Sequence, residues 1–146
     1  MQAEAKLGLP KSYGQQTPYG FFLFTSFVAW LIATLVMRLW GHTFFFPSSN
    51  LNMIAIFLLP LVCLPPFVHA LFRWKGLQPN QYLEATICLA IPGMLLDVET
   101  AYFFQRVYPN VLPSADGPYG AWLLWVYLIV LVTGLATSLH SKLRKV

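Results

Sequence analysis

The chain has 146 residues, of which 58% are hydrophobic and only 10% are charged, and its net charge is +4. Soluble domains carry about 25% charged residues, so this chain has too little charge to cover a water-exposed surface. The composition excludes an ordinary soluble protein and leaves the lipid bilayer as the solvent. Cys63 and Cys88 lie in apolar runs without CxxC spacing, which excludes a thiol-redox or zinc motif of that kind.

Residues 1–18 are polar and rich in turn formers, and we expect them to form a surface arm. The apolar run that follows starts too late and is too long for a signal peptide, so we expect it to remain as an anchor. This first span covers about residues 19–40, and about 20 apolar residues cross a hydrocarbon core of about 30 Å. Thr17 suits its N-cap and Pro18 its first helical position.

The second predicted span covers about residues 51–72. A polar residue just before it is expected to cap the helix: Ser48, Ser49 or Asn50. It contains three prolines: Pro60, Pro65 and Pro66. Each proline removes one backbone hydrogen bond and frees a carbonyl four residues earlier. Because lipid offers no partner for such a carbonyl, we expect a kinked helix that packs against protein on at least one side.

The third span is predicted over about residues 79–105 and the fourth over about 119–140, with Pro118 at the first helical position. Between them lies a dense cluster of turn formers. The predicted fold is an all-α integral membrane protein, a four-transmembrane-helix bundle over residues 19–140 with kinked second and third helices. Residues 141–146 form a basic tail.

The basic residues predict the orientation of the bundle. Seven flank the side that holds both termini: Lys6, Lys11, Arg73, Lys75, Lys142, Arg144 and Lys145. Only Arg38 and Arg106 lie on the other side. The positive-inside rule therefore predicts that both termini are cytoplasmic. We also expect anionic lipid headgroups to attract the basic tail, at roughly 1 kcal/mol per cation near the surface.

Ionisable residues within a span are candidates for function because their burial in lipid is costly. Asp97 and Glu99 fall near the outer end of the third span. Residues two apart on a helix point about 200° away from each other, so these carboxylates cannot share one face. One interpretation is a structural ion pair with Arg38 or Arg106; the other is a proton or cation site at Asp97.

The depths of two prolines favour the second interpretation. Pro60 and Pro92 lie about 13 Å and about 10 Å below the outer face when counted at 1.5 Å per residue. Two broken helices at one depth, with Asp97 a turn further out, would frame a small polar cavity open to the outside, as broken helices do in larger transporters.

Other side chains invite interpretations that the sequence favours less. His69 and His140 lie near one depth on separate helices, where they could ligate haem, but interfacial histidines are the simpler interpretation. Trp122 and Trp125 are typical of an interfacial aromatic belt, although a pigment or quinone could stack there. We therefore predict no cofactor. Gly134 and Ser138 form a small-xxx-small pattern, which suits close packing within the bundle or against a partner.

Several motifs resemble those of a family of small four-span bacterial membrane proteins of unknown function. They are IPGMLLD at 91–97, FF at 103–104, VYPN at 107–110 and YGAWLLW at 119–125. The resemblance covers all four spans, most clearly residues 91–134, and implies the four-helix fold and a bacterial origin. It implies no activity. Positions that match the family pattern become candidate site positions: Pro92, Gly93, Asp97, Pro109 and Asn110.

The sequence therefore predicts a non-enzymatic accessory or structural subunit that packs against partner helices, or against itself, in a bacterial plasma membrane, or in a thylakoid membrane if the source is cyanobacterial. The absence of a P-loop, GxSxG, HExxH or cysteine cluster motivates the non-enzymatic choice. No nucleic-acid partner is expected. One alternative is a small oligomeric transporter or channel that uses Asp97 beside the proline-bearing helices. A further alternative is a haem- or quinone-binding redox protein.

Overall fold

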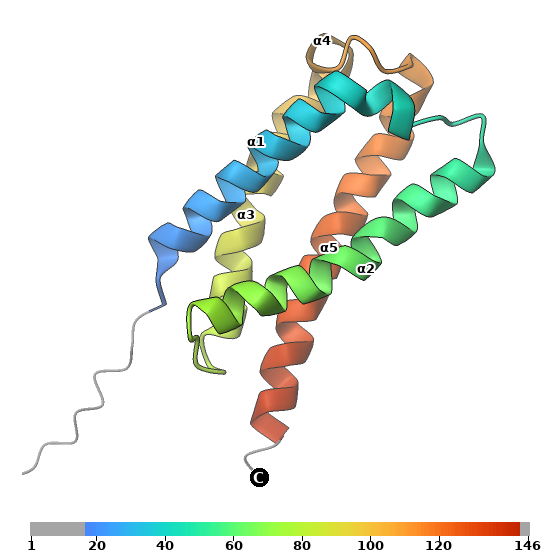
Figure 1. Ribbon diagram of the computed structural model, residues 1–146. Helices are drawn as coiled ribbons and strands as arrows, with labels where there is room; N and C mark the ends of the chain where they lie inside the picture. Colours follow the sequence, from blue (N-terminus) through green and yellow to red (C-terminus); the bar gives the residue numbers. More distant parts are fainter. Residues whose placement is uncertain (1–16, 144–146) are drawn as a thin grey trace, which may run out of the picture.

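The computed structural model describes residues 17–143, apart from the Lys142 side chain, and over this range the chain is helical without strands. The four long helices are α1 (Tyr19–Phe44), α2 (Asn50–Trp74), α3 (Tyr82–Tyr102) and α5 (Asp116–Leu143) (Figure 1). A short helix, α4 (Phe104–Val107), and a 3₁₀ turn, η1 (Pro113–Ala115), connect α3 to α5. Most of the predicted arm and the last three residues of the predicted tail lie outside the described residues.

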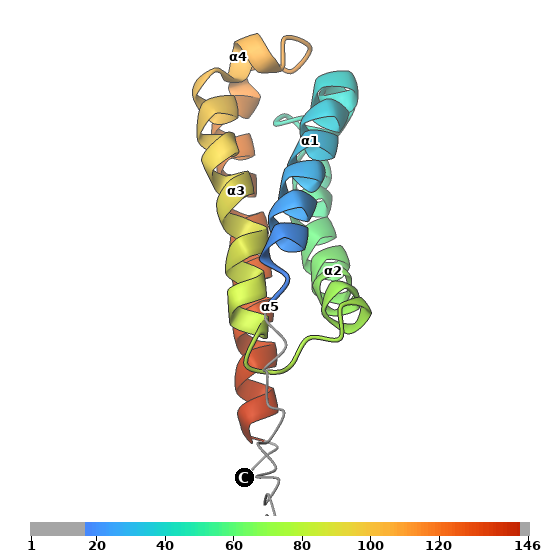
Figure 2. The same cartoon turned by 90° about the vertical axis from the view of Figure 1, so that its left-hand side faces the viewer.

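Each of the four long helices is long and apolar enough to cross a membrane. The chain is thus a multi-pass membrane protein, and the predicted all-α four-helix bundle is confirmed. The N-terminal end of α1 and the C-terminal end of α5 lie toward one end of the bundle, which we name the terminal end. α4 lies at the opposite end, which we name the far end (Figures 1 and 2).

The helices do not pack in the order of the sequence. α1 packs along α3, α3 along α5, and α5 along α2. α1 and α2 are consecutive, yet they do not pack along each other. In Figure 1 they lie in front of α3 and α5, and their ribbons are separated along most of their length.

Two apolar clusters hold the ends of the bundle together. The terminal-end cluster comprises Phe22, Val68, Leu71, Phe72, Leu77, Ala85, Leu89 and Val130. The far-end cluster comprises Met37, Phe45, Phe104, Tyr108, Val111, Ala115 and Tyr119. The far-end cluster contains a buried polar contact, because the hydroxyls of Tyr108 and Tyr119 lie 2.8 Å apart.

The predicted start of the first span at residue 19 is confirmed, although its predicted cap is wrong, and two other predicted helix starts are wrong by two or three residues. α1 begins at Tyr19, and the Thr17 hydroxyl does not cap it but donates to Glu84 Oε2 at 2.8 Å. α3 begins at Tyr82 because a turn precedes it, closed by the backbone N–H of Gln78 on Gln81 Oε1 at 2.8 Å. α5 already begins at Asp116, so Pro118 is not its first residue.

The predicted cap of α2 is confirmed. Ser49 is the N-cap residue, and its hydroxyl oxygen accepts from the backbone N–H of Asn52 at 3.4 Å. At the same far end of the bundle, α3 stops at Tyr102, three residues before the predicted end of the third span. The chain then turns at Phe103 into α4.

Prolines lie within α2 and α3 without breaking either helix. α2 remains helical through Pro60, Pro65 and Pro66, and α3 remains helical through Pro92. The description of these segments as broken helices is therefore wrong. A proline removes the N–H that would bond the carbonyl four residues earlier. The chain can still continue as a helix when another group donates a hydrogen bond to that carbonyl.

Side chains from neighbouring helices supply those partners. Pro60 frees the carbonyl of Ile56, and the indole N–H of Trp122 donates to that oxygen at 3.0 Å. The indole N–H of Trp125 donates to the next carbonyl, Phe57, at 2.8 Å. Both tryptophans thus bond α5 to α2, so they are more than the interfacial belt that the sequence suggested.

Candidate functional site

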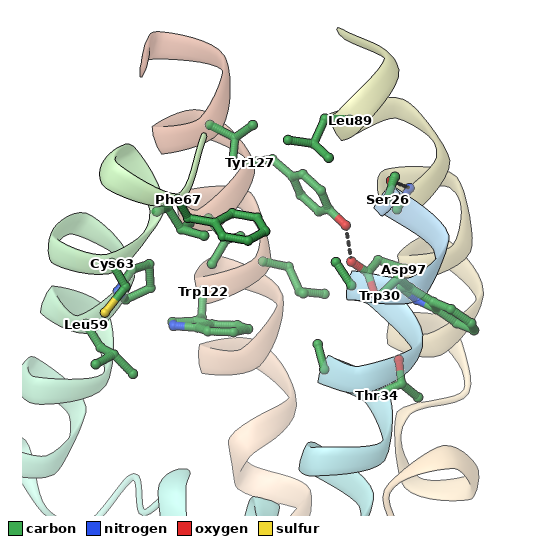
Figure 3. Close-up of a pocket in the computed structure, with 18 of the residues that line it drawn as sticks. Ser26, Trp30, Thr34, Leu59, Cys63, Phe67, Leu89, Asp97, Trp122 and Tyr127 are labelled. Carbon is green, nitrogen blue, oxygen red and sulfur yellow. Dashed lines mark hydrogen bonds between the residues drawn. The ribbon is translucent and has the colours of Figure 1, made fainter. Parts of the chain in front are cut away.

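A cavity of about 330 Å³ lies between the four long helices (Figure 3). Its walls are mainly aliphatic and aromatic. α1 supplies Ser26, Ala29, Trp30, Ala33, Thr34 and Met37; α2 supplies Leu59, Pro60, Cys63, Leu64, Phe67 and Val68; α3 supplies Leu89, Gly93 and Asp97; α5 supplies Tyr119, Trp122, Leu123, Val126, Tyr127 and Val130. Pro60 and Asp97 line this cavity, as predicted, but Pro92 does not, and the walls are largely apolar where a polar cavity open to the outside was expected.

Asp97 is the only ionisable carboxylate in the wall. Its side chain is 8% exposed. The Tyr127 hydroxyl donates to Oδ2 at 2.5 Å (Figure 3). The Thr100 hydroxyl donates to Oδ1 at 3.1 Å. Neither donor carries a positive charge. A carboxylate buried in apolar surroundings is normally paired with a cation or neutralised by a proton.

Trp30 adds an indole donor to the same wall. Its Nε1 is buried, and it interacts with the Asp97 carboxylate although it makes no hydrogen bond of full geometry with the described residues. Figure 3 shows Trp30 next to Asp97. The indole is therefore a third uncharged donor beside the buried carboxylate.

Gly93 makes the Asp97–Tyr127 contact possible. It lies four residues before Asp97, on the same face of α3. A Cβ at position 93 would lie 2.6 Å from the Tyr127 hydroxyl oxygen. The backbone N–H of Gly93 donates to Ser26 Oγ at 3.1 Å, which ties α1 to α3 one residue after Pro92. This position therefore joins α1, α3 and α5 around the carboxylate.

The cavity opens sideways, between α1 and α2. Five of its wall residues are exposed, and all five come from these two helices: Ala29, Ala33, Leu59, Cys63 and Phe67. The wall residues of α3 and α5 are buried or half-buried. We name this opening the lateral window. In a bundle that crosses a membrane, it faces lipid tails.

The lateral window is closed at both ends. At the terminal end, the Phe22 and Phe72 rings are 6.4 Å apart, and the Phe21 and Trp74 rings are 5.5 Å apart. At the far end, Phe45 in the α1–α2 loop packs against Trp122, with the two rings 5.8 Å apart. The opening is therefore bounded above and below and does not run along the whole bundle.

The other predicted polar residues lie outside the cavity. Glu99 is exposed while Asp97 is buried, as the 200° separation predicted. The predicted ion pair is wrong, since no ion pair joins Glu99 to an arginine among residues 17–143. Arg38 instead donates to the carbonyl of Val107 at 2.7 Å, where it caps the C-terminal end of α4. The Arg106 guanidinium lies over the Phe103 ring, 5.6 Å from its centre.

The small-xxx-small pattern packs within the bundle. Gly134 faces Thr86 of α3 so closely that an added Cβ would lie 2.6 Å from the Thr86 Cβ. Ser138, one turn later, is 4% exposed. Of the two uses that the sequence allowed, packing within the bundle is the one observed.

The remaining candidates are peripheral. His69 and His140 are exposed and do not line the cavity, and no group of three metal-ligating side chains occurs in the described part of the chain. The amide Nδ2 of Asn110 lies 3.2 Å from His42 Nδ1 at the far end. Pro109 is exposed.

Sequence reasoning missed Tyr127, Trp30 and Ser26. Each reaches Asp97 or Gly93 from another helix, and no motif links them along the chain. The signal that was available is chemical: a buried acid in a span needs donors, and hydroxyls and indoles on other spans are the natural supply.

Comparison with known proteins gives a family but no activity. No curated protein matches the chain. No solved structure matches it either. A family model described as "Family of unknown function (DUF5367)" matches residues 44–141, which cover α2, α3, α4 and nearly all of α5. The chain therefore belongs to this family of unknown function.

Proposed function

We propose that this protein binds a lipid-soluble small molecule within the bilayer and exchanges it with the surrounding lipid through the lateral window. One observation carries the proposal: a mostly apolar cavity with a buried carboxylate opens towards lipid between two consecutive helices that do not pack along each other.

The size and chemistry of the cavity support a small ligand. Ligand pockets in proteins typically measure about 300–1,000 Å³ and combine apolar walls with a few convergent polar groups. This cavity measures about 330 Å³, and its polar groups gather around Asp97. A small molecule that dissolves in lipid would reach it without crossing a polar surface.

The bounded window favours a small molecule over a partner helix. A transmembrane helix that docked between α1 and α2 would need a groove along the full bundle, about 30 Å. The aromatic contacts at the terminal end and the Phe45 contact at the far end interrupt any such groove. The small residues that suggested an accessory subunit are, moreover, used between α3 and α5.

A transport role would extend this proposal. The two apolar clusters lie at opposite ends of the cavity and separate it from both membrane surfaces. That arrangement supports a binding site over an open channel. The closed cavity supports binding of the ligand. If the ligand were then released towards one membrane surface, the protein would be a transporter.

The test asks whether the protein retains a lipid-soluble compound and whether this retention requires an open lateral window. The chain would be purified into lipid nanodiscs, extracted with organic solvent and analysed by mass spectrometry. Ala33→Phe narrows the window, whereas Ala70→Phe adds the same ring to an exposed α2 position that does not line the cavity.

We expect a compound that is enriched with the wild type and with Ala70→Phe, and depleted with Ala33→Phe. Identical extracts from all three proteins and from empty nanodiscs would refute the proposal. So would a wild-type chain that runs as a dimer which Ala33→Phe dissociates, because the window would then be filled by a second copy.

A further inference from the structure

We infer that the ligand is a lipophilic cation, an amine or quaternary ammonium compound with an apolar body, whose charge lies between Asp97 and the aromatic wall of the cavity. This inference rests on the proposed function and names the chemical class of the ligand.

The charge balance of the cavity is the first argument. Its wall contains one carboxylate and no lysine, arginine or histidine. Arg38 and Arg106, at the far end of the bundle, are both exposed. Arg38 donates to the Val107 carbonyl, and Arg106 lies over the Phe103 ring. A buried carboxylate without a cation is costly, and a cationic ligand supplies the missing charge. An anionic ligand would be repelled by the Asp97 carboxylate and would find no cation in the wall.

The aromatic side chains are the second argument. Five line the cavity: Trp30, Phe67, Tyr119, Trp122 and Tyr127. Cations are attracted to the faces of aromatic rings, and cages of such rings recognise quaternary ammonium groups. Trp30 and Tyr127 lie next to Asp97 in Figure 3, so rings and carboxylate can act on one positive group.

The path of entry is the third argument. The exposed rim of the window is formed by alanine, leucine, phenylalanine and cysteine side chains, with no charged residue among them. A strongly hydrated ion has no favourable contact on such a rim. A cation that carries its own apolar body can enter from the lipid and place its charge inside.

The experiment compares two probes of one shape. Both have the same brominated dodecyl chain; one ends in trimethylammonium and the other in the isosteric neutral tert-butyl group. Bromine quenches tryptophan fluorescence on contact, and Trp30 and Trp122 line the cavity. The saturable part of the quenching, in nanodiscs of zwitterionic phosphatidylcholine, reports binding. Asp97→Asn removes the charge in the wall, and Glu99→Gln removes an exposed charge two residues away on the same helix.

We expect the cationic probe to bind the wild type and Glu99→Gln about tenfold more tightly than it binds Asp97→Asn. The neutral probe should bind all three proteins equally. Equal affinity of the cationic probe for all three proteins, with saturable binding retained, would overturn the inference and leave the proposed function standing. No saturable quenching by either probe in any protein would refute both.

Thermal unfolding shows whether Asp97→Asn still folds like the wild type. Asparagine retains an oxygen that can accept from Tyr127, so Asp97→Asn should unfold within a few degrees of the wild type. If it does not, Asp97→Glu gives a second comparison, because the negative charge is kept in the same wall. We expect Asp97→Glu to bind the cationic probe more tightly than Asp97→Asn, and equal affinity of these two variants would overturn the inference.

Discussion

Asp97 is held by hydroxyl groups from two helices, and this arrangement depends on the absence of a side chain at position 93. The Tyr127 hydroxyl lies over Gly93 and reaches the carboxylate from α5. Thr100 provides the second bond from the same helix as Asp97. The local geometry is therefore set by three positions, none of which is charged.

Gly93→Ala should disturb this contact directly. The new methyl group would lie within 2.6 Å of the Tyr127 hydroxyl oxygen, so the tyrosine must move away from Asp97. Overpacking of this kind costs about 1–3 kcal/mol. Unfolding in a fixed detergent should show the loss. Gly120→Ala, where an added Cβ meets nothing within 4 Å, should be neutral or slightly stabilising. Equal stability of the two variants would contradict the close contact.

Tyr127→Phe should destabilise the protein by about 1–3 kcal/mol, because it leaves a buried acceptor with one partner fewer. Tyr102→Phe removes the same hydroxyl from a tyrosine that is 81% exposed on α3, and it should change stability little. Chemical or thermal unfolding of the two variants in the same detergent makes the comparison. A smaller effect at 127 than at 102 would show that the Asp97 bond adds nothing to stability.

Asp97 and Glu99 show what sequence reasoning can achieve at single residues. Helical geometry predicted that they face opposite ways, and one is buried while the other is exposed. The partner of Asp97 was not predictable in the same way. Tyr127 is 30 positions away, and its approach depends on how α5 is rotated about its own axis.

At the scale of helices, α2 depends on α5 for its missing hydrogen bonds. Pro60 leaves the Ile56 carbonyl without its helical donor, and Trp122 donates to it from α5. The sequence predicted that freed carbonyls need partners from neighbouring helices, and this bond is such a partner. It did not predict which residue would serve, because the tryptophans also fit an interfacial belt.

A double-mutant cycle on Pro60→Ala and Trp122→Phe tests this dependence. In the wild type, Trp122→Phe removes the side-chain donor to the Ile56 carbonyl. In Pro60→Ala the backbone N–H returns, so the same change should cost less. Hydrogen bonds between membrane helices average about 0.6 kcal/mol and reach about 1.7 kcal/mol, which bounds the expected coupling. A coupling energy of zero would contradict the interpretation.

The α3–α5 contact depends on Gly134. An added methyl group would meet the Thr86 side chain at distances that require the helices to separate. Gly134→Ala should therefore destabilise by roughly 1–3 kcal/mol. Gly120→Ala on the same helix serves again as the control, since it meets open space. Unchanged unfolding of Gly134→Ala would show that this contact is looser than described.

At the scale of the whole molecule, the sequence predicted the number and approximate extent of the helices but not their neighbours. Length and apolarity identify a span because a bilayer has a fixed thickness. They do not identify a partner, because lipid tails are as apolar as a leucine side chain and every face of a span is hydrophobic. The separation of α1 from α2, and with it the lateral window, therefore had no signal in the hydrophobic pattern.

The lateral window predicts how lipid-soluble reagents reach the interior. A carbene photolabel dissolved in the bilayer should mark Val126 and Tyr127 on the inner wall, detected by peptide mass spectrometry. Ala33→Phe should lower that labelling to the level of Thr86, which is fully buried between α3 and α5. Ala70→Phe should leave it unchanged. Equal labelling of the inner wall in the wild type and in Ala33→Phe would contradict entry through the window.

The lengths of the helices make this opening respond to the membrane itself. α3 has 21 residues and α1 has 26, which correspond to about 32 Å and about 39 Å along their axes. A helix longer than the hydrocarbon layer matches it by tilting, and a thicker layer asks for less tilt. α1 must therefore stand more upright in a thick bilayer than in a thin one, while α3 changes less. α2 has 25 residues, about 38 Å, so both rims of the opening belong to helices that are longer than the hydrocarbon layer and respond to its thickness.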